Sequence, residues 1–439
     1  MFLSGTMQVN EHGNLEIGGC DVMELKEKYE TPVNILDEKL IRDNCRIYKE
    51  AFEKNYEKHQ VIYAGKAFLN SWICNVMEEE GLGLDVVSGG ELYIALKSNF
   101  PPEKIYFHGN NKSPSELEMA LDSGVGRIVV DNFYELDLLE KKCQEKAKKV
   151  HVYFRVTPGI EAHTHEYIKT GTEDSKFGFN ITEDGIWKAV EKVNNLENLN
   201  LKGLHCHIGS QIFDKEPFRL TAETMMNVMI KINNEYGILL DELDLGGGIG
   251  IRYKGDEKVE GLNNFVKMIC DTVKEISETN NFPLPKLMLE PGRSIIGEAG
   301  VMLYSVGAIK EIEGTRKYVS VDGGMSDNIR PALYNAEYTA MVANKADEKV
   351  KEKVTIAGKA CESGDILIKD IDLPEVEPED TIAMFSCGAY TYSMASNYNL
   401  LTRPPVVTVK DGISKIILER ETYDDLLAKD LNFREVCKG

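Results

Sequence analysis

The sequence lacks the features that mark several protein classes. Its nine cysteines, at positions 20, 45, 74, 143, 206, 270, 361, 387 and 437, include no C-x-x-C pair. This scatter is typical of reduced cytosolic thiols and argues against a disulfide framework or a zinc site. No apolar run approaches the length of a membrane span, and the N-terminus has no basic segment followed by an apolar one. Neither a membrane protein nor a secretory signal is therefore expected.

Positive charge is also scarce. The chain has 51 Lys and Arg residues against 72 Asp and Glu residues, a net charge of -21. Such an excess disfavours nucleic acid and anionic membranes as partners. The 439 residues are too many for one ordinary hydrophobic core, so two domains are expected. These features together predict a cytoplasmic protein of two domains.

Short apolar runs alternate with amphipathic stretches between about residues 60 and 290. The runs predict strands at 61–67, 82–88, 104–109, 126–131, 150–156, 201–208, 242–248 and 286–292. Ser113 and Asn132 are plausible helix N-caps, and Glu116 and Glu135 complete capping-box patterns. Eight strands in βα alternation favour an α/β fold of the (β/α)8 TIM-like barrel type. A doubly wound open sheet is the alternative, and the eight regular repeats disfavour it.

After Gly300 the pattern changes to strand-like segments separated by turns, without long helices between them. This predicts a C-terminal β-sandwich or β-barrel domain. The opening stretch "NEHGNLEIGG" (10–19) has the character of a hairpin and is expected to join that domain. The expected division is a barrel over residues 36–295 and a β domain formed by residues 1–35 and 296–439.

One lysine stands in an otherwise apolar or aromatic run, "VIYAGKAF" (61–68). Because burying a charge is costly, Lys66 is expected to have a specific partner or a chemical role. The active site of a (β/α)8 barrel forms at the C-terminal ends of its strands. Unusual residues gather at those predicted ends: Lys66, Ser88-Gly89-Gly90, His108, Arg155, "HCHIGS" (205–210), Gly246–Gly248 and Glu290–Arg293. One shared ligand explains them better than ordinary loops do.

Each of these elements is weak by itself. The glycine triplet can be only a tight turn, and no G-x-x-x-x-G-K-[ST] pattern supports nucleotide hydrolysis. His207 could be a core histidine, and Glu290 could simply pair with Arg293. Together they describe a pyridoxal phosphate site. Lys66 would hold the cofactor as a Schiff base, Ser210 and the glycine loop would take the phosphate, Glu290 would pair with the ring nitrogen, and His207 would cover one ring face.

The chain resembles the group IV, alanine-racemase-like pyridoxal phosphate decarboxylases. The resemblance runs from "YAGKAF" (63–68) to "GAYTYSMASNYN" (388–399). It includes "GLDVVSGGEL" (83–92), "FHGNNKS" (107–113), "HTHEYIKTG" (163–171), "SKFGF" (175–179), "GLHCHIGSQI" (203–212), "DLGGGIGIRY" (244–253), "EPGRSI" (290–295), "VDGGMSDNIRPALY" (321–334) and "CESGD" (361–365). One departure precedes the barrel, where the common Gly-Thr-Pro reads Glu30-Thr31-Pro32.

The resemblance implies a role for each matching position. Around the cofactor it places Lys66, His207, Ser210, Gly247, Gly248, Glu290, Pro291, Gly292, Arg293 and Tyr390. Substrate contacts are implied for Arg293, Arg330, Tyr334, Glu362 and Tyr390. Cys361 would be the proton donor, supplied with Glu362 by the partner subunit of a homodimer, and Lys66 and His207 complete the catalytic set. The β domain would then contribute to the active site and to the dimer interface.

Substrate choice can be argued from charge. Arg330 can hold a second carboxylate and Glu362 an ammonium, which favours meso-diaminopimelate, giving L-lysine and CO2. An arginine facing a purely cationic side chain would be repulsive. The alternative substrates are ornithine, arginine and carboxynorspermidine, and Arg330 could also be a structural ion pair. An amino-acid racemase is disfavoured by "CESGD" and "RPALY", and a non-catalytic homologue by the presence of Lys66 and Cys361.

Overall fold

The computed structural model describes residues 3–160, 174–255, 257 and 260–431. The chain divides into two compact units, each described here by itself. The barrel unit comprises Arg42–Ile251 and Lys258–Ile296, and the β unit comprises Met1–Ile41, Arg252–Glu257 and Gly297–Gly439. In the part of the chain that the structure describes, no helix is both long and apolar enough to cross a bilayer.

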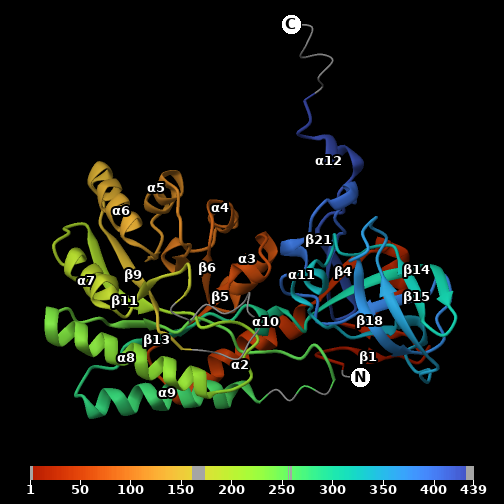
Figure 1. Ribbon diagram of the computed structural model, residues 1–439, viewed down its shortest axis with the longest axis horizontal. Coiled ribbons are helices and arrows are strands. Elements are labelled where there is room, and N and C mark those ends of the chain that lie inside the picture. Colours follow the sequence, from red (N-terminus) through yellow and green to blue (C-terminus); the bar gives the residue numbers. More distant parts are fainter. Residues whose placement is uncertain (1–2, 161–173, 256, 258–259, 432–439) are drawn as a thin grey trace, which may run out of the picture. The chain divides into compact units, whose positions relative to one another are not determined.

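Eight parallel strands of the barrel unit close into a ring (Figure 1). In ring order they are β5 (His59–Ala64), β6 (Gly83–Val86), β7 (Ile105–Phe107), β8 (Arg127–Val130), β9 (Val150–Thr157), β11 (Leu199–His205), β12 (Glu242–Asp244) and β13 (Lys286–Leu289). The ring is complete because β8 pairs with β9 and β13 pairs with β5. This confirms the predicted (β/α)8 barrel and excludes the open sheet.

Helices alternate with the strands as predicted. The helix α2 (Glu38–Asn55) precedes the barrel, and the strands are followed by α3 (Ser71–Glu79), α4 (Gly89–Lys97), α5 (Pro114–Ser123), α6 (Phe133–Lys146), α7 (Lys188–Val193), α8 (Glu216–Tyr236), α9 (Leu262–Thr279) and α10 (Arg293–Ile296). Shorter elements are the turns η1 (Gly65–Ala67), η2 (Pro102–Lys104) and η4 (Glu183–Trp187), and the strand β10 (Phe179–Asn180). Figure 1 shows α8 and α9 side by side.

The two predicted N-caps differ in detail. Ser113 forms the full capping box of α5 with Glu116, as predicted. Asn132 caps α6 by accepting from the N–H of Glu135. The Glu135 side chain, however, accepts from the N–H of Asp131 and from Lys112 Nζ at 2.7 Å. Glu135 is buried and forms an ion pair with the buried Lys112. It therefore stabilises a charge in the core as well as the start of the helix.

A polar cluster lies near the N-terminal ends of the barrel strands. Arg127 Nε and Nη2 each donate to the Glu242 carboxylate at 2.7 Å, and Tyr153 Oη donates to the same group at 2.6 Å. A layer of buried side chains from five strands follows: Ile62, Tyr106, Val129, Tyr153 and Met288. The site predicted from the sequence lies at the opposite, C-terminal ends of the strands.

The β unit is built from two sheets. One holds β1 (Gln8–Val9), β2 (Leu15–Ile17) and β3 (Cys20–Asp21), which confirms the predicted hairpin. The other holds β4 (Val33–Asp37), β14 (Gly300–Ile312), β15 (Arg316–Val321), β16 (Ala340–Val342), β17 (Glu352–Ala357), β18 (Ile366–Leu373), β19 (Thr381–Met384), β20 (Val406–Lys410) and β21 (Ile413–Leu418). Its helices are α1 (Val22–Tyr29), α11 (Arg330–Tyr334) and α12 (Tyr423–Leu427), and its 3-10 turns are η5 (Ala343–Lys345), η6 (Tyr392–Met394) and η7 (Tyr398–Leu400).

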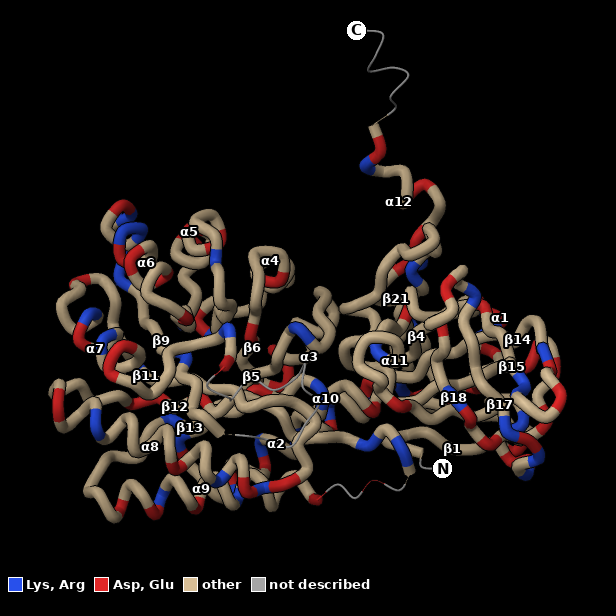
Figure 2. Tube along the Cα trace, viewed as in Figure 1, with Lys and Arg blue, Asp and Glu red and all other residues tan. Residues whose placement is uncertain are grey.

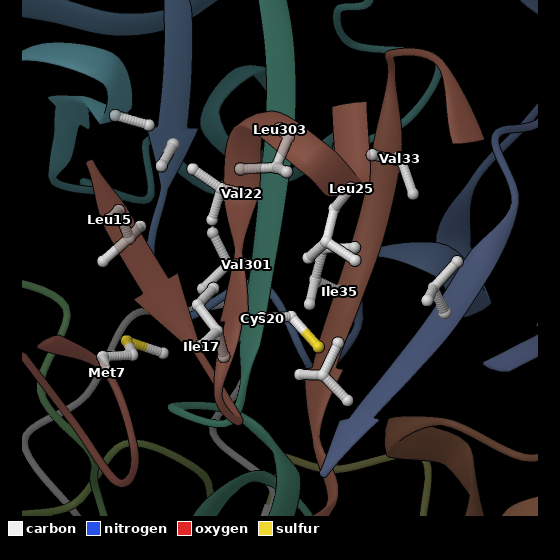
Figure 3. Close-up of a cluster of buried hydrophobic side chains, with 14 of the residues drawn as sticks. Met7, Leu15, Ile17, Cys20, Val22, Leu25, Val33, Ile35, Val301 and Leu303 are labelled. Atoms are coloured by element: carbon white, nitrogen blue, oxygen red, sulfur yellow. The ribbon is translucent and has the colours of Figure 1, made fainter. Parts of the chain in front are cut away.

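The core of the β unit joins the N-terminal hairpins to the larger sheet. Leu15, Ile17 and Val22 pack in one cluster with Val301 and Leu303 (Figure 3). Because β4 also pairs with β14 and β20, the first 37 residues are bound to strands from the last third of the chain. The N-terminal segment, although far from these strands in the sequence, therefore completes the β unit.

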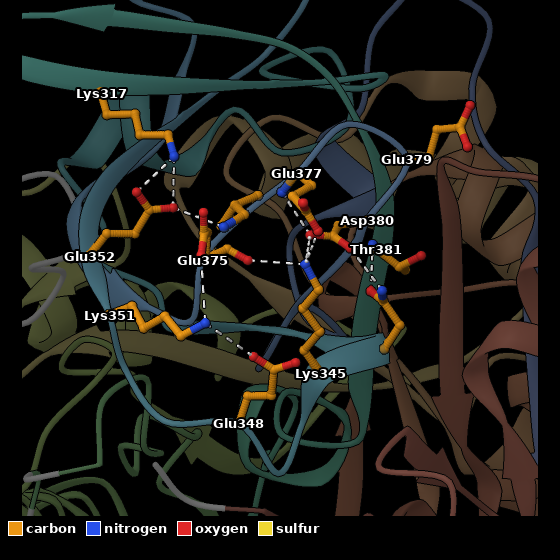
Figure 4. A network of polar contacts seen from close by, with 12 residues as sticks. Lys317, Lys345, Glu348, Lys351, Glu352, Glu375, Glu377, Glu379, Asp380 and Thr381 are labelled. Carbon is orange, nitrogen blue, oxygen red and sulfur yellow. Dashed lines mark hydrogen bonds and ion pairs between the residues drawn. The ribbon is translucent and has the colours of Figure 1, made fainter.

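The surface of the β unit carries mixed charge, and acidic and basic residues also alternate along α6 and α9 (Figure 2). Lys345 contacts Glu377 at 2.9 Å and Asp380 at 2.8 Å, and Lys317 contacts Glu352 at 2.7 Å (Figure 4). Pairs of this kind contribute little each to stability. They offset part of the acidic excess without forming a basic patch.

Candidate active site

Lys66 lies just beyond the strand to which it was assigned from the sequence. β5 ends at Ala64, and Lys66 is the middle residue of the 3-10 turn η1. Its neighbours in the turn are buried, but Lys66 is exposed. The expectation of a buried lysine is therefore wrong, because the strand ends at Ala64, three residues before the predicted end at residue 67. The positive charge of Lys66 still acts on the strand-end group: it opposes the burial that raises the pKa of Asp85, and it adds to the desolvation that lowers the pKa of His207.

Glu290 is the centre of a buried polar cluster at the C-terminal ends of the strands. Its Oε1 lies 2.8 Å from His108 Nε2, and its Oε2 accepts a hydrogen bond of 3.1 Å from His205 Nε2. The two imidazole rings meet edge to face with their centroids 4.6 Å apart. Asp85 Oδ1 lies 3.8 Å from the same nitrogen of His108. The sequence placed His108, His205 and Glu290 at strand ends, and the structure brings these three into contact.

The pKa values of the two histidines are shifted in opposite directions. Burial disfavours the charged form of both, but at His108 the carboxylates of Asp85 and Glu290 outweigh it and raise the pKa. At His205 burial dominates and lowers the pKa to about 3, so His205 is neutral and donates through Nε2. Burial alone would raise the pKa of Glu290, yet His108 and His205 lower it well below its usual range. Glu290 is therefore a buried anion.

Two aspartates flank this anion. Burial raises the pKa of Asp85 to about 6, against the opposing effect of His108. Burial and the charge of Glu290 raise the pKa of Asp244 well above its usual range, which favours the neutral form of Asp244. Its Oδ1 accepts the N–H of Gly246 at 2.9 Å. The site thus separates its carboxyl groups into charged and neutral members.

His207 is oriented by the glycine triplet. The N–H of Gly247 donates to His207 Nδ1 at 3.3 Å, which leaves the ring proton on Nε2. Desolvation, followed by the charges of Lys66 and Arg155, lowers the pKa of His207 well below its usual value. His207 is therefore a neutral ring at neutral pH. The amide of Gly247 is engaged by this histidine, a contact that the sequence did not predict.

Crowding of neighbouring backbones explains the triplet itself. A Cβ on Gly246 would lie 2.5 Å from the carbonyl oxygen of Cys206, and one on Gly248 would lie 2.4 Å from that of Gly209. Both residues have positive φ, 67° and 123°. A Cβ on Gly247 would lie 2.2 Å from the carbonyl oxygen of Glu290. The glycines are thus required for the ends of three neighbouring strands to meet.

Ser210 and Arg293 are in contact, as expected for residues that share a ligand. Arg293 Nε and Nη2 donate to Ser210 Oγ at 3.1 and 2.9 Å, and Arg293 is buried. The turn at 290–293 is tied to the end of β5, because the N–H of Ala64 donates to the carbonyl of Pro291 at 3.1 Å. A Cβ on Gly292 would lie 3.0 Å from Ala64 Cβ. Gly292 therefore lets this turn pack against the end of the strand that precedes Lys66.

The remaining predicted site residues belong to the β unit. Arg330, at the start of α11, is buried and donates from Nη1 to Tyr253 Oη at 2.9 Å and to Tyr338 Oη. Among the described residues, no carboxylate lies within ion-pair distance of Arg330, so the alternative of a structural ion pair is not supported there. Tyr334 ends the same helix, and Tyr390 is partly exposed with a positive φ of 58°.

Cys361 and Glu362 are both exposed in the β unit. Of the eight cysteines within the described residues, only Cys361 is exposed. Its N–H donates to Asn399 Oδ1 at 2.7 Å, which fixes the loop that presents the thiol. The motif "HTHEYIKTG" (163–171), which contributed to the resemblance, lies outside the described residues.

Sequence reasoning missed Asp85 and Asp244 as members of the site. Asp85 stands inside the apolar strand "GLDV", Asp244 is the last residue of the short strand "ELD", and both are buried. A carboxylate in such a run was the available signal, because a buried acid needs a partner as much as a buried lysine does. His108 and His205 were noted at strand ends, but their contact with Glu290 was not predicted.

The fold and this site define a class. They are those of pyridoxal phosphate enzymes that combine a (β/α)8 barrel with a β-rich unit. The family model described as "Pyridoxal-dependent decarboxylase, pyridoxal binding domain" matches residues 39–297, more than half of the chain. The chain belongs to this family of pyridoxal-dependent decarboxylases, and its cofactor is pyridoxal 5'-phosphate.

Individual relatives cover the whole chain. It is 51% identical over 438 residues to diaminopimelate decarboxylase of Bacillus subtilis, covering 100% of both chains, and 41% identical to that of Mycobacterium tuberculosis, covering 96% of both. A solved structure of diaminopimelate decarboxylase from M. jannaschii in complex with L-lysine has a TM-score of 0.92 at 37% identity, covering 99% of this chain and 100% of that one.

Proposed function

We propose that this protein decarboxylates meso-2,6-diaminopimelate to L-lysine and CO2, the last step of lysine biosynthesis. The observation that carries the proposal is the full-length similarity to diaminopimelate decarboxylases at 41 to 51% identity. The predicted alternatives, which act on ornithine, arginine or carboxynorspermidine, lack such support. Vibrio vulnificus lysine/ornithine decarboxylase is only 22% identical, a likeness that shows the fold alone.

The residues at the barrel mouth fit the cofactor. Glu290 Oε1 is buried and lacks a hydrogen bond, because its 2.8 Å contact with His108 is not aligned as one. An anionic acceptor of this kind suits the protonated ring nitrogen of the cofactor. Ser210 and Arg293 supply a hydroxyl and a guanidinium for the phosphate, and His207 supplies a neutral planar ring. Lys66 supplies the amine that holds the cofactor covalently.

The cofactor, when bound, draws the electrons of the Cα–carboxylate bond into its ring. The chain's own residues orient the bond and handle the protons. Glu290 keeps the ring nitrogen protonated by accepting its hydrogen bond. Cys361 Sγ would deliver a proton to the carbon that has lost the carboxylate. Cys361 is exposed, whereas the other described cysteines are buried, and this accessibility supports the role.

Arg330 is proposed to hold the distal carboxylate of the substrate. It is a buried cation that contacts two tyrosine hydroxyls, with no carboxylate at ion-pair distance among the described residues. A buried arginine is best stabilised by an anion, and a substrate with a second carboxylate provides one. Glu362 would take the ammonium of the same end, and Tyr334 and Tyr390 would line it. Ornithine and arginine offer Arg330 no such group.

The protein is further proposed to be a cytoplasmic homodimer. Its barrel domain would cover residues 36–295, and its β domain, formed by residues 1–35 and 296–439, would serve the active site and the dimer interface. Cys361 and Glu362 would act from the partner subunit. The exposure of both side chains supports this arrangement, because a group that completes a site on another chain must be accessible on its own.

The direct test is CO2 release from meso-diaminopimelate, L-lysine, ornithine and arginine. Diaminopimelate alone should be turned over efficiently. Turnover of ornithine without turnover of diaminopimelate would contradict the specificity. The Lys66→Ala variant should lose the visible absorbance of the covalently held cofactor, and unchanged absorbance would exclude Lys66 from that role.

A further inference from the structure

We propose that His108 and His205 are positioning residues that hold Glu290 for the ring nitrogen of the cofactor, His108 as a cation and His205 as a neutral hydrogen-bond donor. The inference rests on the proposed cofactor role of Glu290. It adds a division of labour between two histidines that have similar positions but different charges.

The geometry gives each oxygen of Glu290 its own imidazole. His108 Nε2 lies 2.8 Å from Oε1, and His205 Nε2 lies 3.1 Å from Oε2. The histidines come from the ends of β7 and β11, which are not neighbours in the barrel. All three side chains are buried. The Glu290 carboxylate is therefore contacted from two sides by side chains at the ends of barrel strands, which restricts its rotation.

The surroundings differ for the two rings. His108 faces two carboxylates, Glu290 and Asp85 at 3.8 Å, with Arg155 as the opposing cation. Among the described residues, the carboxylate that contacts His205 is that of Glu290. On the neighbouring strands, His205 lies beside Arg155 of β9 and Asp244 of β12. Asp244 is protonated and offers no negative charge. The proton therefore belongs on His108 and not on His205.

The charges of the cluster also point to a cationic ligand. Glu290 and Asp85 are anions at neutral pH, His108 is the cation between them, and His205, His207 and Asp244 are neutral. Arg155 lies 3.9 Å from Asp131, which balances it. The remaining buried charge around Glu290 is one negative charge. A protonated ring nitrogen would neutralise it, whereas an uncharged aromatic ring would not.

The experiment compares two ligands on the purified, cofactor-free protein. One is pyridoxal 5'-phosphate, and the other is its 1-deaza analogue, in which a C–H group replaces the ring nitrogen. His108→Gln removes the cation, so the affinity for pyridoxal phosphate should fall about tenfold or more, while that for the analogue changes less than about threefold. A loss that is equal for both ligands would mean a merely structural role and would overturn the proposal.

His205 has its own pair of variants. Glutamine can place a neutral N–H near the position of Nε2, so His205→Gln should keep the preference for pyridoxal phosphate over the analogue. His205→Leu has no donor and should lose that preference. His151→Gln, a histidine on β9 at the other end of the barrel, is the matched control and should change neither affinity. Equal behaviour of the Gln and Leu variants would contradict the assignment of His205 as a donor.

Histidine ring resonances give a readout that needs no ligand. Resonances assigned from the variants should show His108 losing its proton above the ordinary histidine pKa and His205 staying neutral from pH 5 to 9. The preference for pyridoxal phosphate should weaken as the pH rises through the His108 transition. Protonation of His205 before His108 would overturn the proposal. The donor atoms of His108, His205 and Glu290 lie within 4.8 Å of one another. Tightly bound metal in the purified protein that is lost when either histidine is replaced would therefore also overturn the proposal.

The two levels of inference fail separately. If the wild-type protein does not bind pyridoxal phosphate, the proposed function fails. If it binds the cofactor but the histidine variants show no ligand-dependent difference, only the positioning role fails.

Discussion

The substitution Gly247→Ala tests whether backbone crowding at the strand ends sets the position of Glu290. A Cβ at Gly247 would lie 2.2 Å from the carbonyl oxygen of Glu290, whereas real Cβ contacts stay beyond 3.0 Å. The two backbones must therefore separate by about 0.8 Å. The N–H of Glu290 donates to the carbonyl of Gly246 at 2.8 Å, so the shift would act on β12 and β13 together.

Overpacking of this size costs about 1–3 kcal/mol. If the strain is relieved by moving Glu290 away from His108 and His205, the cost appears in cofactor binding, where 1.4 kcal/mol is about tenfold in affinity. We therefore expect the affinity for pyridoxal phosphate to fall between about 5-fold and 100-fold. The Gly247 amide would also move from His207, which adds to the loss.

Absorbance titration of the cofactor-free protein measures the affinity, and thermal unfolding reports the structural cost. Gly90→Ala is the matched control, because a Cβ there meets only Ser88 Oγ at 3.7 Å, at the start of helix α4. It should be neutral or slightly stabilising. If Gly247→Ala bound the cofactor like the wild type and unfolded at the same temperature, crowding would not be the reason for glycine at this position.

Substitutions at three further positions test other parts of the chain. Glu30 occupies the glycine position of the family with φ 57° and ψ 158°, so Glu30→Gly should stabilise the protein by about 1 kcal/mol in thermal unfolding, while Glu30→Ala, which keeps the positive φ, should not. Cys361→Ala should retain cofactor absorbance but lose most turnover, and near-normal turnover would exclude the thiol as proton donor. Glu242→Gln should destabilise the barrel by about 2 kcal/mol without weakening cofactor binding, because it leaves the half-buried Arg127 without its anion. Burial alone would raise the pKa of Glu242, but its hydrogen bonds with Arg127 lower the pKa below its usual value. The stabilisation by this pair is therefore fully present above the pKa of Glu242 in the unfolded chain, and it is lost as the pH falls through the lower pKa of the folded protein. The stabilities of the variant and the wild type should converge in acid.

The barrel could be predicted because its strands are buried on both faces and read as short apolar runs. All eight runs are strands, but several predicted ends reach past the true ones. The apolar run 61–67 ends in the structure at Ala64, because small and apolar residues fit a buried turn as well as a strand. Hydrophobic pattern reports burial and not hydrogen bonding, so it cannot mark where the chain leaves the sheet.

The site could be predicted residue by residue but not as a network. His207, Ser210, Glu290 and Arg293 stand out because polar residues at strand ends of a barrel share one mouth. Which of them touch depends on ring closure: β7 and β13, which carry His108 and Glu290 at their ends, are separated by β5 and β6. No spacing in the sequence encodes a contact across the barrel interior.

The rule that first drew attention to Lys66 holds, but for other residues. An ionisable side chain buried in a strand or at its end does need a partner or must stay neutral. The rule applies to Asp85, Asp244 and Glu290, which are buried. They are stabilised in three ways: Glu290 by two imidazoles, Asp85 by the charged one of these, and Asp244 by retaining its proton. Lys66 avoids the cost because it is exposed, although the turn beyond the strand is otherwise buried. The barrel therefore keeps the buried anion Glu290 in its interior, and the proposed role of Lys66 requires its amine to be where the cofactor's aldehyde can reach it, which its exposure allows.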